Sequence, residues 1–145
     1  MSVALGREQI EEILPHRDPF LFLDEVTVLE PGSRVVARKR VREDEWFLTG
    51  HFPGRPIMPG VIIVEAMAQT GAVAVLADEA NRGKLALFAG INDVRFKRMV
   101  LPGDELEVIC EVERMRGPVG RGKATATVDG ELAARGTLMF AVTDA

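Results

Sequence analysis

The chain has 145 residues, 47% of them hydrophobic and 28% charged, which is the size and composition of one globular domain with its own core. Lys and Arg number 18 against 22 Asp and Glu, and a net charge of -4 argues against nucleic acid as a partner. A single cysteine and two widely separated histidines exclude an internal disulfide framework and a Cys-cluster zinc site. We therefore expect a single domain over residues 1–145 with no structural metal.

Neither a secretion signal nor a membrane span is indicated. The first residues lack a charged segment followed by an apolar one, and the longest apolar stretch is interrupted by Pro59, Glu65 and Gln69. We expect a cytoplasmic protein in a reducing compartment.

The first half of the chain predicts a short helix, two strands and then one long helix. Residues 7–14 carry apolar side chains at helical spacing and stop at Pro15. Residues 20–29 are apolar and β-branched, and residues 34–42 alternate between apolar and polar, so both segments are expected to be strands. Residues 61–80 are small and aliphatic without an internal proline, which predicts a helix about 30 Å long.

The second half predicts four more strands. They are expected at residues 85–91, 105–115, 123–128 and 131–142. In residues 105–115, glutamates alternate with apolar residues, as in a strand with one buried face and one solvent-exposed face. Asp129 and Gly130, between the last two, best supply the positive φ angles of a type I′ hairpin turn. These patterns predict an α+β fold in which a mostly antiparallel sheet of five or six strands curves around one central helix.

Glu65 is the one ionisable side chain between Ile57 and Ala77, near the start of the predicted long helix. Burying a carboxylate is costly unless it is paired, neutralised or used in chemistry. One interpretation is a satisfied core glutamate that caps its own helix. The segment just upstream, residues 51–60, favours a functional role, because three prolines and two glycines fix a loop between His51 and a helix N-terminus.

His51 and Glu65 in one dry pocket would form a base and an acid. The free N–H groups at the helix start, near Gly60 and Val61, would donate to a developing oxyanion. Together, the base, the acid and the N–H donors could remove a proton from the carbon next to a carbonyl group. Taken alone, His51 would more often be a packed or surface histidine, so the hypothesis depends on the three parts occurring together.

Three other candidates are weaker. The segment from Gly117 to Lys123 matches a phosphate-binding loop, but Ala124 replaces the Ser or Thr that would hold magnesium, and a strand follows instead of a helix. His16 lies on the connection to the first strand with no carboxylate in an obvious pocket, so we expect a structural hydrogen-bonding role. Cys110 points toward the core in its strand, where a free cysteine acts as a small hydrophobic residue.

Three segments resemble a known enzyme family: LPHRDPFLFLDEV, HFPGRPIMPGVIIVEAMAQTG and FAGINDVRFKRMVLPGDELEV. They are similar to those of the FabZ-type (3R)-3-hydroxyacyl-[acyl-carrier-protein] dehydratases of bacterial type II fatty acid synthesis, and the similarity runs from about Ile10 to Val142. The resemblance implies the hot-dog fold, with His51 and Glu65 as catalytic residues and the Gly60 N–H holding the thioester oxygen. Sister enzymes that also isomerise the double bond carry Asp at the position of Glu65, so dehydration alone is implied.

The same resemblance implies partners and an assembly. Acyl carrier protein would deliver the substrate on its phosphopantetheine arm, with no metal or redox cofactor. The two catalytic residues of a site would come from different subunits of a homodimer, and dimers would assemble into hexamers. The family commonly has a tyrosine where this chain has Asp18, and the chain contains no tyrosine. Phe88 is a candidate to replace it beside the acyl tunnel, which leaves the chain-length preference open.

The implied reaction is elimination of water from a 3-hydroxyacyl thioester, with His51 removing the C2 proton and Glu65 protonating the hydroxyl. Two alternatives remain on the same fold: a thioesterase that uses Glu65 to activate water, and a non-enzymatic acyl-binding regulator. Release of free thiol distinguishes the first from a dehydratase. The second would need a DNA-binding segment, for which the assigned residues leave no room.

Arg95, Lys97 and Arg98 place three positive charges within four residues of an acidic chain, and Arg55 lies in the loop that follows His51. A solvated strand end is one explanation. The other is a basic rim that attracts an acidic carrier protein. Strand alternation would put Arg95 and Lys97 on one face and Arg98 on the other.

Overall fold

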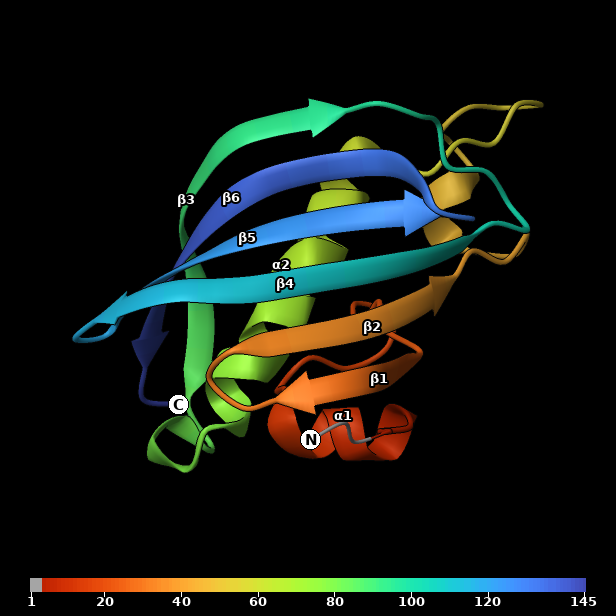
Figure 1. Cartoon of the computed structure of the whole chain (residues 1–145). Helices are drawn as coiled ribbons and strands as arrows, with labels where there is room; N and C mark the ends of the chain where they lie inside the picture. The colour runs from red at the N-terminus through yellow and green to blue at the C-terminus, as the bar shows by residue number, and fades with distance from the viewer. Residues whose placement is uncertain (1–3) are drawn as a thin grey trace.

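The computed structural model describes residues 4–145, in which a six-stranded sheet encloses one long helix (Figure 1). The elements in chain order are α1 (Arg7–Ile13), β1 (Glu25–Glu30), β2 (Arg34–Arg40), the 3₁₀ turn η1 (Trp46–Leu48), α2 (Gly60–Ala77), the 3₁₀ turn η2 (Glu79–Asn81), β3 (Leu85–Phe96), β4 (Glu105–Arg116), β5 (Val119–Val128) and β6 (Glu131–Thr143).

The strands form one sheet in the order β1-β2-β4-β5-β6-β3, and every neighbouring pair is antiparallel. The sheet curves around α2, and α1 lies beside β1 (Figure 1). The predicted α+β fold with a central helix is therefore confirmed. The two edges of the sheet are β1, with 6 residues, and β3, with 12.

Small side chains let α2 lie close to the sheet. A Cβ atom at Gly71 would stand 3.0 Å from the Cys110 sulfur on β4, which is tighter than ordinary contact. Cys110 itself is buried, and burial raises the pKa of its thiol to about 12, so it packs as an apolar residue. By length and hydropathy α2 could cross a membrane, but 78% of it is buried inside this domain, as in a core helix.

The segment before β1 differs from the prediction. Residues 20–24 are not a strand, and side chains from the two helices satisfy the backbone of residues 20–23. Gln69 on α2 accepts a hydrogen bond from the Phe22 N–H at 2.8 Å. Arg7 on α1 donates to the Leu21 carbonyl at 3.0 Å. These side chains, which are distant in the sequence, provide the hydrogen bonds that a neighbouring strand would otherwise provide. The apolar pattern of the segment alone could not reveal them.

β3 is longer than predicted and continues past residue 91 to Phe96. Asn92 and Asp93 interrupt the apolar pattern without ending the strand. The register shifts there in a β-bulge, and Asp93 takes a left-handed φ of 52°. The bulge lets the edge strand bend and stay paired with β6.

Two turn predictions have clear outcomes. Asp129 and Gly130 have φ angles of 50° and 79°, which confirms the type I′ turn between β5 and β6. The phosphate-loop pattern that starts at Gly117 falls on the hairpin between β4 and β5. Because no helix follows this hairpin, the phosphate-loop candidate is excluded.

Candidate active site

Glu65 lies in the second turn of α2, and its side chain is only 17% exposed. The helix begins at Gly60 behind Pro59, and no side chain caps its N-terminus. Instead, the Oε2 atom of Glu65 accepts a hydrogen bond of 2.9 Å from the Gln69 amide one turn later. The interpretation of Glu65 as a residue that caps its own helix is therefore wrong.

Gln69 fixes this carboxyl group from within α2. Its Nε2 atom donates to Glu65 and to the Phe20 carbonyl, at 2.9 and 2.8 Å, while its Oε1 atom accepts from the Phe22 N–H. The amide cannot turn without breaking these three bonds. No site role is predicted for Gln69 from the sequence, although its position four residues after Glu65 is the spacing at which helical side chains meet.

His16 lies in the same cavity, contrary to expectation. This cavity of about 160 Å³, here called the Glu65 cavity, places the His16 Nε2 atom 3.7 Å from the Glu65 Oε2 atom. The Nδ1 atom of His16 is buried without a hydrogen-bond partner among the described residues. The expectation that no carboxylate shares the pocket of His16, and that its ring is a structural hydrogen-bonder, is wrong. Only the tertiary fold brings these two residues together.

Burial makes both groups prefer their neutral forms. Desolvation raises the pKa of Glu65, and the Gln69 hydrogen bond offsets part of the rise. Desolvation, and then the Arg17 charge, lower the pKa of His16. Both shifts oppose an ion pair between the two groups. Oε2 faces the Gln69 amide and the His16 ring, whereas Oε1 meets no donor among the described residues.

His51 is oriented by its own loop. Its backbone N–H donates to the Leu48 carbonyl at the end of η1, and its Nδ1 atom lies 2.8 Å from the Ile57 carbonyl. A carbonyl oxygen can only accept, so Nδ1 carries a hydrogen, and in the neutral ring the lone pair is on Nε2. The ring also stacks on Phe52, with the centroids 4.1 Å apart. This tautomer presents Nε2 as a base.

A second cavity of about 750 Å³, here called the His51 groove, contains the start of α2. The N–H groups of Gly60 and Val61 have no earlier carbonyl of the helix to bond. A Cβ atom at Gly60 would stand 2.8 Å from the Phe96 ring, so any larger residue would have to displace that ring or the helix start. The groove thus combines the base with N–H donors at the positive end of a helix.

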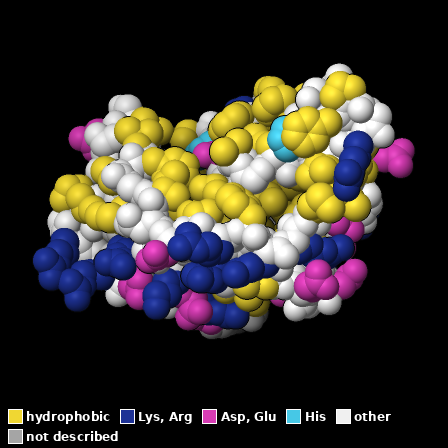
Figure 2. All heavy atoms as spheres, turned by 90° about the horizontal axis from the view of Figure 1, so that it is seen from above, with side chains coloured by type: hydrophobic (Ala, Val, Ile, Leu, Met, Phe, Trp, Pro, Cys, Tyr) yellow, Lys and Arg dark blue, Asp and Glu magenta, His cyan; other side chains and the backbone are white. Residues whose placement is uncertain are grey.

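The Glu65 cavity and the His51 groove are separate within one chain. No residue lines both. Figure 2 shows the two histidines on one face of the molecule, with hydrophobic side chains between them. His51 and Glu65 therefore share no pocket within a single chain, and their pairing across two subunits stays a prediction. We call the two cavities half-sites, because each contains only part of the predicted acid, base and oxyanion donor.

Comparison with known proteins identifies the family. Residues 14–137 match the FabA-like domain family. The chain is 55% identical over 140 residues to the 3-hydroxyacyl-[acyl-carrier-protein] dehydratase FabZ of Bacillus cereus (strain AH187), with 97% of each chain covered. This chain belongs to the FabZ family. The FabZ of Bacillus thuringiensis (strain Al Hakam) matches it with the same identity and coverage.

Solved structures share the fold of this FabZ family member. The dehydratase heterocomplex ApeI:P from Xenorhabdus doucetiae matches with a TM-score of 0.81 at 21% identity, over 93% of this chain and 91% of that chain. A thioesterase superfamily member from Thermus thermophilus matches with a TM-score of 0.65 at 19% identity, over 80% and 85% of the two chains. These likenesses establish the hot-dog fold.

Two residues expected near the acyl tunnel of a FabZ protein lie apart. Phe88, on β3, lines the Glu65 cavity beside Leu87. Asp18, where the resemblance implies a tyrosine, is exposed and lines neither half-site. Phe88 is therefore the better placed of the two to contact a chain that enters this cavity.

The basic residues of this FabZ family member divide between two places. Lys97 and Arg98 line the His51 groove, whereas Arg95 lies directly opposite Arg135 of β6. Lys97 follows the end of β3, so strand alternation no longer groups it with Arg95. The Arg98 guanidinium forms an ion pair of 3.3 Å with Glu131. Lys97 forms no ion pair among the described residues, which makes it the freest cation on the rim of the groove.

Proposed function

We propose that this chain dehydrates (3R)-3-hydroxyacyl groups carried by acyl carrier protein to trans-2-enoyl groups, in the fatty acid synthesis of the cytoplasm. The observation that carries the proposal is the pair of half-sites in a chain 55% identical to a FabZ dehydratase. One half-site offers an imidazole ring held by the Ile57 carbonyl, together with free N–H groups, and the other offers a carboxyl group whose pKa is raised by burial. These are the base, oxyanion donor and acid that elimination of water requires.

In the proposed reaction the His51 Nε2 atom takes the proton from C2. The electron pair of the C2–H bond forms the double bond as the C3–O bond breaks, and Glu65 gives its proton to the hydroxyl, which leaves as water. The Gly60 N–H donates to the thioester oxygen while negative charge gathers there. Proton exchange with water then restores neutral His51 and Glu65. The protons and electrons of this elimination balance without a metal or a redox cofactor.

Glu65 is suited to the acid role in this scheme. Burial raises its pKa, so the carboxyl group keeps its proton to a higher pH than an exposed glutamate. The Gln69 hydrogen bond to Oε2 leaves Oε1 to carry that proton toward the substrate. Because the residue is Glu and not Asp, we propose dehydration without isomerisation of the double bond.

We further propose that two copies of the chain complete each other's half-sites. The outer edge of β3 has no strand beside it in residues 4–145, and Leu87, Ile91 and Phe96 on this strand are all about half exposed. Val61, at the start of α2, is 75% exposed. A long apolar edge strand normally needs a partner.

Pairing of β3 with β3 of a second copy would extend the sheet and cover these apolar side chains. Both histidines lie on the same apolar face (Figure 2). A twofold axis through that face would turn the His51 groove of one subunit toward Glu65 of the partner subunit. We propose this dimer, and its assembly into hexamers, on the resemblance to the dehydratase family.

The acidic carrier protein would approach the rim of the His51 groove. Lys97 and Arg98 line this groove, and Lys97 is free of ion pairs among the described residues. A basic rim raises the association rate of an acidic partner and loses this effect in salt. The phosphopantetheine arm would then enter beside Gly60.

The test is incubation of the whole protein with crotonyl and 3-hydroxyacyl thioesters, with the enoyl absorbance and free thiol followed together. A dehydratase changes the absorbance in both directions without release of thiol. Release of thiol without interconversion would establish a thioesterase instead. No change in either signal, with folded protein, would refute the proposal.

A further inference from the structure

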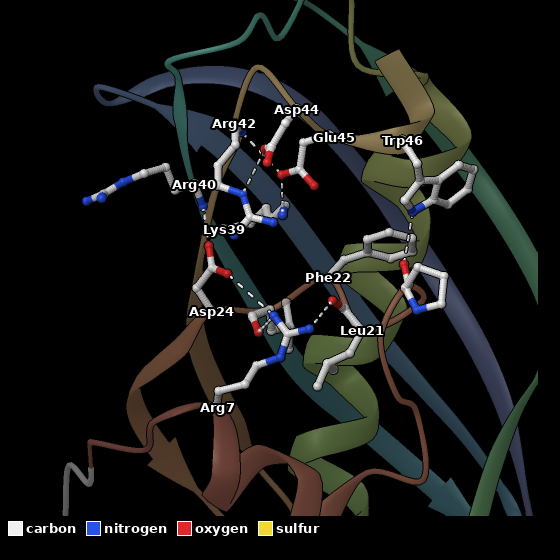
Figure 3. Close-up of polar contacts among 12 residues, drawn as sticks. Arg7, Leu21, Phe22, Asp24, Lys39, Arg40, Arg42, Asp44, Glu45 and Trp46 are labelled. Atoms are coloured by element: carbon white, nitrogen blue, oxygen red, sulfur yellow. Dashed lines mark hydrogen bonds and ion pairs between the residues drawn. The ribbon is translucent and has the colours of Figure 1, made fainter. Parts of the chain in front are cut away.

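A buried ion pair lies outside both half-sites. Lys39, near the end of β2, is 3% exposed, and Glu45, just before η1, is 7% exposed. The Lys39 Nζ atom lies 2.5 Å from the Glu45 Oε2 atom, and the same oxygen accepts the Arg42 N–H at 3.2 Å (Figure 3). Every other ion pair within residues 4–145 has more exposed partners.

Stability alone explains this pair poorly. The loss of hydration when two charges are buried often exceeds their mutual attraction, and an apolar pair of the same volume is often as stable. What a buried pair provides is a fixed geometry, because neither charge can move away without losing its partner. In this chain the fixed geometry applies to Glu45 and to the segment that follows it.

The ion pair is connected to His51 through η1. The Glu45 carbonyl accepts the Leu48 N–H at 3.1 Å, and the Leu48 carbonyl accepts the His51 N–H at 3.0 Å. Two successive backbone hydrogen bonds thus run from the residue whose side chain is locked to the residue that carries the base. At the opposite side of η1, the Trp46 indole N–H donates to the Pro19 carbonyl at 3.0 Å (Figure 3).

We propose that the Lys39–Glu45 pair is a positioning device that sets the placement of the His51 ring. Lys39 holds the Glu45 side chain against β2, Glu45 fixes the start of η1, and η1 delivers the backbone of His51 to its bond with Ile57. The inference rests on the proposed base role of His51. Lys39 and Glu45 contact no substrate, so they act only through the position of that ring.

The experiment compares two variants of the full-length protein. Lys39→Met/Glu45→Gln removes both charges and keeps an oxygen for the Arg42 N–H. Asp44→Asn is the matched control, because it removes an ion pair of Arg42 from the same turn, and the Asp44 side chain is 81% exposed. Three quantities are measured: the thermal unfolding midpoint, kcat and KM on a 3-hydroxyacyl thioester, and the NMR signal of the hydrogen that His51 Nδ1 donates to Ile57.

We expect the double variant to unfold close to the wild-type temperature, with kcat reduced by about 10-fold or more and KM within about threefold. A displacement of about 1 Å at a reacting group can cost about 100-fold in rate. The Nδ1–H signal should exchange faster with water, and Asp44→Asn should match the wild type in all three measurements.

A double variant with wild-type kcat and an unchanged Nδ1–H signal would overturn the inference. An equal loss in Asp44→Asn would also overturn it, because the effect would then belong to the turn as a whole. If the double variant does not fold, Glu45→Gln alone is judged by the same criteria. The base role of His51 is tested separately: it fails if His51→Ala keeps its dehydration activity. In that case the NMR signal of the Nδ1 hydrogen still tests whether the ion pair positions the ring.

Discussion

Replacement of Glu65 by Gln tests the acid role with the smallest change of shape. Gln keeps an oxygen for the 2.9 Å hydrogen bond from Gln69 but has no proton to release. A positioned proton transfer contributes about 100- to 10,000-fold to a rate, or about 3 to 5 kcal/mol of the barrier. We expect kcat for dehydration to fall by at least about 100-fold in an assay coupled to an enoyl reductase.

The same variant should be more stable than the wild type at neutral pH. Burial raises the Glu65 pKa above the ordinary 4.5, so the folded protein holds this proton more tightly than the unfolded chain. Wild-type stability therefore falls as the pH rises from the unfolded pKa through the raised folded pKa. Gln avoids that loss, so the difference should vanish below pH 4.5. Urea unfolding of both proteins across this pH range measures it.

Glu79→Gln, at an exposed glutamate of η2, is the control and should leave the dehydration activity unchanged. If Glu65→Gln dehydrates within a few-fold of the wild-type rate, the acid role is wrong. If the variant is instead less stable at neutral pH, the carboxyl group serves the fold and the reasoning from its raised pKa fails.

Three further predictions concern the rest of the site. Inactive His51→Ala mixed with inactive Glu65→Gln should regain about a quarter of wild-type activity after random exchange, since each mixed dimer holds one intact site; exchange seen by mass spectrometry without rescue would contradict the shared site. Gly60→Ala should lower kcat by about 10-fold or more, because its Cβ meets Phe96 at 2.8 Å. Adding Phe96→Ala should relieve this clash, and no relief would argue against it as the cause. Lys97→Glu should raise KM for carrier-bound substrate in a salt-sensitive way and spare a small N-acetylcysteamine thioester. Equal losses on both substrates would exclude a docking role.

The parts of the fold that the sequence predicts correctly depend on short-range patterns. The alternation along β4, the proline-free run of α2 and the Asp129–Gly130 turn each involve residues a few positions apart. Glu65 stood out in the same way, as one charge inside an apolar helix. His51 stood out beside a loop stiffened by prolines and glycines.

The parts that could not be predicted depend on tertiary contacts. No local pattern indicates that Gln69 satisfies the backbone at Phe22, which removes the strand expected there. Nothing near His16 in the sequence reveals that its ring faces Glu65. His51 lies in the loop before α2 and Glu65 lies in the second turn of that helix. Only the packing of the loop and the helix against the sheet determines that the two side chains enter different cavities.

Each half-site is organised by contacts within its own chain. Gln69 holds the Glu65 carboxyl group, and the Ile57 carbonyl sets the tautomer of His51. The direction of the Glu65 pKa shift is therefore established before any partner arrives. In the proposed dimer, association would have to supply only the distance between acid and base, and an apolar interface around them would desolvate Glu65 further, which raises its pKa in the same direction. Dimer formation would thus strengthen a bias toward the neutral acid that the single chain already has.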